Sequence, residues 1–150
     1  MIKTSKQSIT PFLWYDGNAV EAAKFYCLIF KGSKILNQNA VSATFKIMGQ
    51  TLIAFNGGPL FKFTPAVSFF VTVSTQKEVD HYWKKLSKGG ELSRCGWLKD
   101  KYGLSWQVIP DCLGKMLTDK DPVKAGRVMK AMMGMIKIDI KGLKRAYDGK

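Results

Sequence analysis

Trp97 and Lys99 are two side chains whose types and spacing suit the binding of a small molecule. They stand two positions apart in a short segment with the pattern of a β-strand, so both project from the same face of it. An aromatic ring beside a cation offers a flat wall and a positive charge, which suits a planar or anionic ligand. The alternative is a tryptophan at a sheet edge beside a lysine whose stem covers apolar surface while its ammonium stays in water.

Two amide side chains are further candidates for ligand contacts. Gln107 lies in the last predicted strand, and the alternation that turns it to the same face as Ser105 turns Trp106 toward a helix-covered core. The Gln107 amide either hydrogen-bonds a ligand or satisfies a neighbouring backbone group. Asn56 precedes Gly57-Gly58-Pro59 and is either a ligand contact or a turn-forming residue.

The residue types that ordinarily supply nucleophiles and metal ligands are few. His81 is the one histidine, and it falls on a predicted helix, where we expect it to be exposed rather than to bind a metal. Cys27, Cys95 and Cys112 are odd in number and widely spaced, with no pair at the spacing of a metal clip. We therefore expect reduced thiols that act as small buried hydrophobes and not as catalytic nucleophiles.

The net charge of +13 at pH 7 is typical of proteins that bind nucleic acids or acidic surfaces. The excess is spread along the chain, at +4 in residues 1–60, +4 in 61–110 and +5 in 111–150, so nucleic-acid binding is disfavoured. No apolar run reaches the roughly 18 residues of a membrane span, and the polar first eight residues lack a signal core. We expect a cytoplasmic protein without membrane contact.

The spacing of apolar residues predicts a βαβββ order in the first half of the chain. An aromatic, β-rich segment ends at the turn signal Asp16-Gly17, and Asn18 is placed to cap the helix that follows. The predicted elements are a strand over 9–15, a helix over 19–30, and strands over 34–37, 40–48 and 50–56.

The same order begins again after a loop over residues 60–65. Thr75 and Glu78 form a capping box, and Val79, Trp83 and Leu86 recur at helical spacing. The predicted elements are a strand over 66–74, a helix from Thr75 to Gly89, and strands over 91–95, 97–100 and 104–110.

Residues 111–150 are predicted to form a helical tail. Asp121 as cap and Pro122 at the first helical position start a Met-rich helix to about residue 136, and a shorter helix is predicted over 138–147. The apolar stripe of the first helix consists of Val128, Met129, Met132, Met133 and Ile136. We expect this stripe to pack on the chain's own domain or on a dimer partner rather than to bind a ligand.

These elements predict an α+β fold that forms a single domain over residues 1–150. Two βαβββ modules, about 9–58 and about 66–110, would form a curled mixed sheet with a cleft, followed by C-terminal helices over 111–150. Because order and spacing repeat, the modules should be related by pseudo-twofold symmetry, with their inner faces lining the cleft.

Several segments carry a resemblance to a known superfamily. They are Ile9–Gly17, Lys24–Tyr26, Phe55–Pro59, Phe61–Phe63, Cys95–Gln107 and the tail from Asp121 through Met132. The chain resembles the vicinal oxygen chelate superfamily, which includes glyoxalase I, extradiol dioxygenases and fosfomycin-resistance proteins. Within it the chain looks closest to the PhnB-like branch, often labelled 3-demethylubiquinone-9 3-methyltransferase, and Trp97–Gln107 is the most specific segment.

The resemblance implies a divalent metal held by His, Gln or Glu from the first, fourth, fifth and eighth strands, in a protein that is commonly a homodimer. At those strands this sequence offers Thr10, Phe12, Trp14, Ala54, Asn56, Ser68, Phe70 and Gln107. None of these residues is His, Asp or Glu, so we expect no standard metal site and no cofactor, with a divalent metal as the disfavoured alternative. Gln107 falls where the resemblance places a glutamate ligand.

The methyltransferase label lacks support from the sequence, because an S-adenosylmethionine enzyme of the doubly wound type needs a Gly-rich turn between a strand and a helix. Gly57-Gly58-Pro59 lies between strands instead.

We predict that the protein binds a small planar or anionic molecule in an aromatic cleft, and we assign no catalytic residue. The candidate contacts are Phe12, Trp14, Asn56, Ser68, Phe70, Trp97, Lys99 and Gln107. The alternatives are a metal-dependent lyase, isomerase or dioxygenase with unusual ligands such as Asn56, Gln107 and water, and a methyltransferase.

Overall fold

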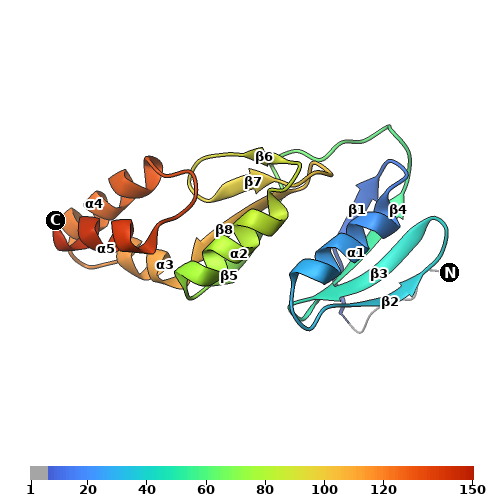
Figure 1. Cartoon of the computed structure of the whole chain (residues 1–150), viewed down its shortest axis with the longest axis horizontal. Coiled ribbons are helices and arrows are strands. Elements are labelled where there is room, and N and C mark those ends of the chain that lie inside the picture. Colours follow the sequence, from blue (N-terminus) through green and yellow to red (C-terminus); the bar gives the residue numbers. More distant parts are fainter. Residues whose placement is uncertain (1–6) are drawn as a thin grey trace. The chain divides into compact units, whose positions relative to one another are not determined.

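A computed structural model describes residues 7–150, which form two compact units that divide between Phe63 and Thr64 (Figure 1). The division falls in the loop predicted between the two modules. Residues 1–6 lie outside the described residues. The expectation that the first eight residues contain no signal segment depends partly on them.

The first unit has the predicted βαβββ order. Its elements are β1 (Phe12–Tyr15), α1 (Ala19–Ile29), β2 (Lys34–Gln38), β3 (Ser42–Ile47) and β4 (Gln50–Asn56). The strands form one sheet in the order β1-β4-β3-β2, in which β1 and β4 are parallel and the other pairs are antiparallel. The first strand is shorter than predicted, since it begins at Phe12 instead of Ile9.

Helix α1 covers one face of this sheet. Ala22 and Ala23 are fully buried and let the helix approach the strands closely, while the Tyr26 ring stacks on that of Phe45 with centroids 6.0 Å apart. Alternation along β1 then places Phe12 and Trp14 on the opposite face of the sheet.

The second unit repeats the order. Its elements are β5 (Ser68–Val73), α2 (Gln76–Leu86), β6 (Glu91–Leu92), β7 (Trp97–Lys99) and β8 (Ser105–Pro110). The sheet order is β5-β8-β7-β6, with β5 and β8 parallel, as β1 and β4 are in the first unit. The predicted α+β fold with two βαβββ modules is confirmed; the cleft stays a prediction.

The start of α2 matches its prediction in detail. The Glu78 backbone N–H donates to the Thr75 hydroxyl, and the Thr75 backbone N–H donates to the Glu78 carboxylate over 2.9 Å, which completes the capping box. Val79, Trp83 and Leu86 are buried against the sheet, as their spacing indicated.

Strand β6 is shorter than the predicted 91–95. Cys95 has a φ of 58°, which ends an extended conformation, and the backbone N–H groups of Cys95 and Gly96 donate to the carbonyls of Met135 and Ile136. Residues 94–97 form the turn from β6 into β7, in which the Trp97 N–H donates to the Arg94 carbonyl, and the tail accepts from the other two N–H groups of this turn.

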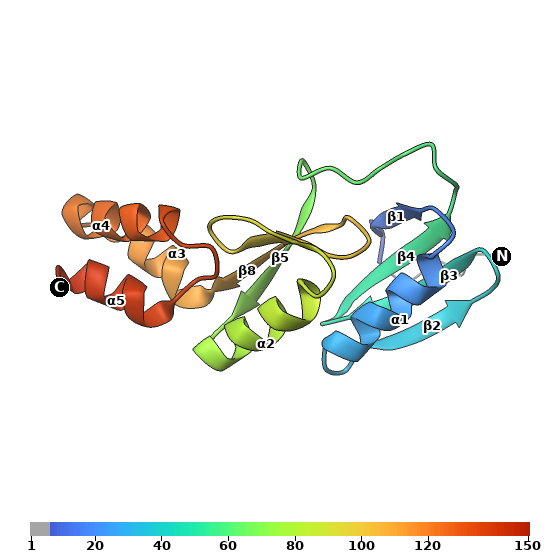
Figure 2. The ribbon, with the colours of Figure 1, turned by 45° about the horizontal axis from the view of Figure 1, so that its top comes forward.

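The tail packs on the second unit as a helical lobe, which lies beyond the end of β8 (Figures 1 and 2). Its helices are α3 (Asp111–Leu117), α4 (Pro122–Met133) and α5 (Ile140–Asp148), of which α3 was not predicted. Ile109, Leu113, Val128, Ile138 and Leu143 form its buried core. The Asp121 carboxylate accepts from the amides of Val123 and Lys124, as expected of the cap.

The Gln76 side chain ties the lobe to α2. Its Nε2 donates to the Ile138 carbonyl over 3.1 Å, and its Oε1 accepts from the Ile140 N–H over 2.9 Å. Lys137 and Asp80 add an ion pair at 2.6 Å. Among the described residues, no helix is long and apolar enough to cross a membrane.

Candidate functional site

The face of the second sheet opposite α2 brings five of the eight predicted contacts together. In the strand register, Phe70 of β5 lies opposite Gln107 of β8, which lies opposite Trp97 of β7. Side chains on adjacent strands at such positions stand about 5 Å apart at Cβ. The three side chains therefore form one row across the sheet, with the amide between two aromatic residues.

A second, polar row runs beside the first. Ser68 lies opposite Ser105, Ser105 opposite Lys99, and Lys99 opposite Glu91. The Lys99 ammonium is 3.3 Å from the Glu91 carboxylate, and the two side chains are 40% and 74% exposed. An ion pair this exposed contributes about 0–1 kcal/mol, so another anion can replace Glu91 at little cost.

Gln107 joins the two rows. Its Nε2 donates to the Ser68 hydroxyl over 3.0 Å, and the side chain is half-buried. The sequence left two roles open for this amide, a ligand contact or a neighbouring backbone group, and its partner is instead a side chain. Its Oε1 has no hydrogen-bond partner within residues 7–150, so it remains an acceptor on this face.

A hollow of about 270 Å³ adjoins the polar row. Trp97, Lys99 and Ser105 line it from the sheet, Glu91 and Leu92 from β6, and Pro65 from the segment before β5. Small-molecule sites begin at about 300 Å³, so this hollow has the size for one ring with a small polar group.

The buried carboxylate of Asp100 fixes the turn between β7 and β8. It accepts from the backbone amides of Tyr102 and Leu104 over 2.8 and 3.1 Å, and from the Trp106 indole N–H over 2.8 Å. Asp100 is 3% exposed. This residue was not predicted from the sequence, although an aspartate that begins a turn before Gly103 is a signal of such an anchor.

In the first unit, Phe12 and Trp14 belong to an aromatic cluster with Phe55 and Phe61. The centroid of the Phe55 ring is 5.5 Å from that of Phe12 and 5.7 Å from that of Trp14, and Phe61 is 5.1 Å from Trp14. The Trp14 indole donates to the Gly58 carbonyl over 2.9 Å and covers Gly57 so closely that a Cβ there would overlap the ring. Phe55 was not among the predicted contacts.

Asn56 lies away from this cluster. Its partner in the register is Tyr15, on the α1 side of the sheet, and its Oδ1 accepts from the Ala19 N–H over 2.7 Å. Asn56 therefore caps α1 from the end of a distant strand. Asn18 occupies the N-cap position as predicted, but its side chain makes no cap hydrogen bond, so the expected capping by that side chain is wrong.

The donors near the Gln107 row do not fit a divalent metal ion. They are neutral amide and hydroxyl groups, and the nearby Glu91 carboxylate is paired with Lys99. Within residues 7–150 no group of three or more His, Cys, Asp or Glu is placed to hold a metal, and His81 is exposed on α2.

The thiols are poorly suited to nucleophilic attack. Burial raises the pKa of Cys27, and burial followed by the charge of Asp111 raises the pKa of Cys112, so both stay protonated at neutral pH. All three cysteines are half-buried and none forms a disulfide.

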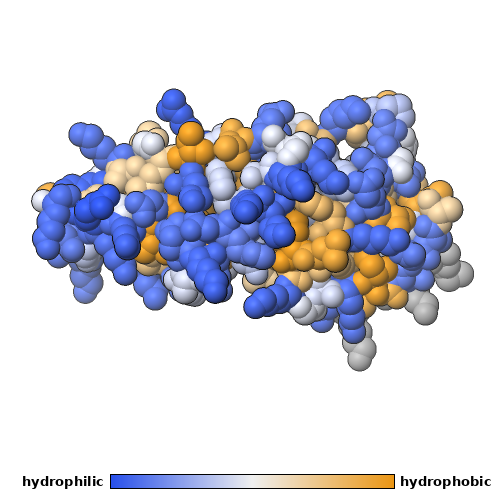
Figure 3. Space-filling view, viewed as in Figure 1, coloured by the Kyte–Doolittle hydropathy of each residue, from blue (hydrophilic) through white to orange (hydrophobic). Residues whose placement is uncertain are grey.

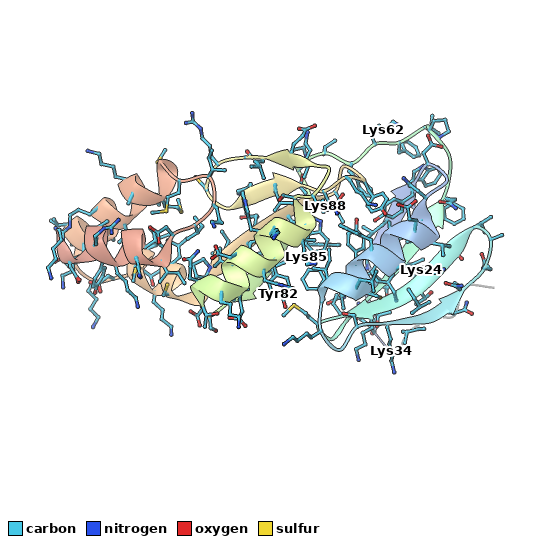
Figure 4. The ribbon with its side chains drawn as sticks, in the orientation of Figure 1. Lys24, Lys34, Lys62, Tyr82, Lys85 and Lys88 are labelled. Atoms are coloured by element: carbon cyan, nitrogen blue, oxygen red, sulfur yellow. The ribbon has the colours of Figure 1, made fainter. Side chains whose placement is uncertain are left out.

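Lysines are distributed over separate elements of each unit. Figure 4 shows Lys24 on α1 and Lys34 on β2 in the first unit, and Lys85 and Lys88 at the end of α2 in the second. Cations at the end of a helix interact favourably with its carbonyl groups, which gives Lys85, in the last turn of α2, a local structural role.

Comparisons with known proteins agree with this architecture. The family model of 3-demethylubiquinone-9 3-methyltransferase matches residues 7–109. A PhnB protein from Bacillus cereus, whose description carries the same methyltransferase name, is 34% identical with a TM-score of 0.65, over 69% of this chain and 99% of that one. A comparison with the curated proteins finds no match.

Two further structures share the fold. A protein from Pseudomonas aeruginosa is 18% identical, with a TM-score of 0.58, over 70% of this chain and 98% of that one. The fosfomycin resistance protein FosX from Listeria monocytogenes, solved with Mn(II) and sulfate, is 14% identical with a TM-score of 0.54, over 71% of this chain and 91% of that one.

The paired βαβββ modules and these neighbours define a protein of the vicinal oxygen chelate fold, as the resemblance indicated. Within that fold, the chain belongs to the 3-demethylubiquinone-9 3-methyltransferase family, in its PhnB-like branch.

Proposed function

We propose that the protein binds a small planar anion, such as an aromatic carboxylate, on the face of its second sheet. The observation that carries the proposal is the register that sets Trp97 beside Gln107 and Lys99 beside Ser105, with Trp97 and Lys99 lining a hollow. Trp97 supplies a flat apolar wall, Lys99 a cation held by a weak exposed pair, and Gln107 a hydrogen-bonding amide.

Three related compounds separate the two properties of the ligand. Benzoate is planar and anionic, benzamide is planar and neutral, and cyclohexanecarboxylate is anionic without a flat ring. Isothermal titration calorimetry should find that benzoate binds more tightly than either of the others, because it alone meets both the ring of Trp97 and the charge of Lys99. Equal affinity for benzoate and benzamide would refute the role of Lys99.

Variants then locate the site. A charge-assisted hydrogen bond contributes about 1.5–3 kcal/mol, and the exposure of Lys99 places Lys99→Met at the low end, which corresponds to about tenfold weaker binding of benzoate. Trp97→Leu should weaken benzoate more than cyclohexanecarboxylate. Lys84→Met removes an exposed lysine from α2, on the other side of the sheet, and is the matched control.

The family description supports a methyltransferase activity only through its name. The sheets here are four-stranded and mixed, unlike the parallel doubly wound sheet that binds S-adenosylmethionine in many methyltransferases. Titration with S-adenosylmethionine tests this alternative, and tight binding would replace the proposal.

A metal-dependent enzyme is tested by thermal melts after chelation and after addition of Mn²⁺, Ni²⁺, Zn²⁺ or Fe²⁺. A rise in melting temperature that Gln107→Ala abolishes would replace the proposed anion site with a metal site. The homodimer and the cytoplasmic location stay predictions, of which the first is checked by light scattering of the purified protein.

A further inference from the structure

We infer that the groove between α4 and α5 is a docking site for an acidic amphipathic helix of a partner protein. The groove has a volume of about 600 Å³ and lies entirely within the C-terminal lobe of the second unit. It is separate from the face of the sheet proposed above to bind a small anion, so the inference does not depend on that proposal.

Small and flexible residues form the floor of the groove. Ala131 and Gly134 line it from α4 and its end, Ala146 from α5, and Met135 from the connecting segment. The small residues keep the floor low, and an unbranched methionine side chain adapts to the shape of a partner. An amphipathic helix laid into an apolar groove between two helices is a recurrent mode of peptide recognition.

The charged side chains of the groove are all cationic. Arg127 donates to the carbonyls of Ala146 and Tyr147 over 2.8 and 2.7 Å, so it holds α5 against α4. Lys130 and Lys150 are exposed and have no ion-pair partner among the residues that the structure describes. The ammonium groups of these two lysines are therefore available to pair with carboxylates of a partner. Repulsion between like charges disfavours binding of a second copy of the same basic lobe in the groove.

Apolar side chains are also exposed on α4 outside the groove, which neither Met129 nor Met133 lines. Met133, three residues after Lys130, is 60% exposed, and Met129 is 43% exposed. Figure 3 shows pale orange atoms over α4 among blue side chains. Of the predicted stripe, Val128 is fully buried and packs within the chain's own lobe, while Met129 and Met133 face solvent, so their packing on a dimer partner stays a prediction.

The shape of the site favours a protein partner over a membrane. A bilayer presents a flat surface and would contact the exposed Met129 and Met133 without filling the groove, whereas a helix fills it. The family model ends at residue 109, so the lobe that carries the groove lies outside the matched module. An added lobe with its own core and an unfilled basic groove fits a role in partner binding.

Selection from a phage-displayed random peptide library on the full-length protein tests the inference. Enriched peptides should combine Asp or Glu with apolar residues at helical spacing. The double variant Lys130→Glu, Lys150→Glu should bind them at least about tenfold more weakly, as expected when both rim charges are reversed. Ala131→Phe, which raises the floor without a change in charge, should also weaken binding. The control Lys120→Glu, Lys141→Glu makes the same charge change at exposed positions of the lobe outside the groove and should leave affinity unchanged.

Three results would overturn the inference. One is enriched peptides that lack acidic residues, and a second is equal loss of binding in the groove variant and its control, which would indicate attraction to the basic lobe at large. The third is no enrichment while vesicles of phosphatidylserine and phosphatidylcholine bind the protein through Met129 and Met133, which would assign the lobe to a membrane surface. Circular dichroism of each variant checks that it is folded.

Discussion

Substitution of the buried turn anchor, Asp100→Asn, should destabilise the second unit in a way that depends on Trp106. In the native protein one carboxylate oxygen accepts from the amides of Tyr102 and Leu104, and the other accepts from the Trp106 indole. Asparagine keeps the shape of the side chain and one oxygen acceptor. Its amino group then faces either the indole N–H or the two backbone N–H groups, so at least one buried donor loses its acceptor.

The structure sets the magnitude of this effect. Asp100 and Trp106 are 3% and 1% exposed, so water does not replace the lost acceptor. Loss of a buried hydrogen bond to a charged group costs about 1.5–3 kcal/mol. Trp106→Phe removes the indole donor, so Asp100→Asn should cost at least about 1 kcal/mol less in that background.

Urea denaturation followed by tryptophan fluorescence measures the four proteins of this double-mutant cycle. Trp83 and Trp97 lie in the same unit and still report its unfolding when Trp106 is replaced. A cost for Asp100→Asn below about 0.5 kcal/mol, or the same cost with and without the indole, would show that the hydrogen bond does not hold the turn. In either case, a feature other than this hydrogen bond would have to hold β7, with Trp97 and Lys99, in register with β8.

Three further predictions concern other contacts. Asn56→Ala should lower the free energy of unfolding of the first unit by about 1 kcal/mol because it removes the cap of α1, whereas Asn18→Ala should have little effect; chemical denaturation measures both. The hydrogen bond from Lys137 to Asp80, followed by that from Gln76, lowers the pKa of Asp80. The ionised Asp80 should therefore stabilise the fold above the ordinary aspartate pKa, and this contribution should be lost as the pH falls through the lowered pKa. NMR titration of the Asp80 carboxyl carbon measures that pKa. Gln76→Ala should speed hydrogen exchange at the start of α5, because the side chain accepts from the first amide of that helix; unchanged exchange there would contradict its role in holding the lobe.

Much of the fold follows from local sequence patterns. The Thr75 and Glu78 capping box predicts the start of α2 because both partners lie within one helical turn. The alternation around Trp97 and Lys99 places both on one face because the period of a strand is two. The set of side chains that share this face of the second sheet could therefore be predicted from the sequence, while ligand binding there stays a proposal.

Other features depend on contacts between distant segments and have no local signal. Asn18 stands at the N-cap position of α1, but the capping hydrogen bond comes from Asn56, 37 positions away from Ala19, which no local pattern indicates. Helix α3 has seven residues, including Gly114, and its buried residue Leu113 joins a core formed with α4 and α5. A helix this short depends on tertiary packing for its stability, which a pattern over one window does not reveal.

The central claim, a planar anion bound on the second sheet, is tested most directly by ¹H–¹⁵N NMR of the labelled protein during titration with benzoate. The account predicts saturable shifts of the Trp97 indole, the Lys99 amide and the Gln107 side-chain amide, which Lys99→Met weakens and Lys84→Met does not. No saturable shift at these positions, or a set of shifts confined to other elements, would contradict it.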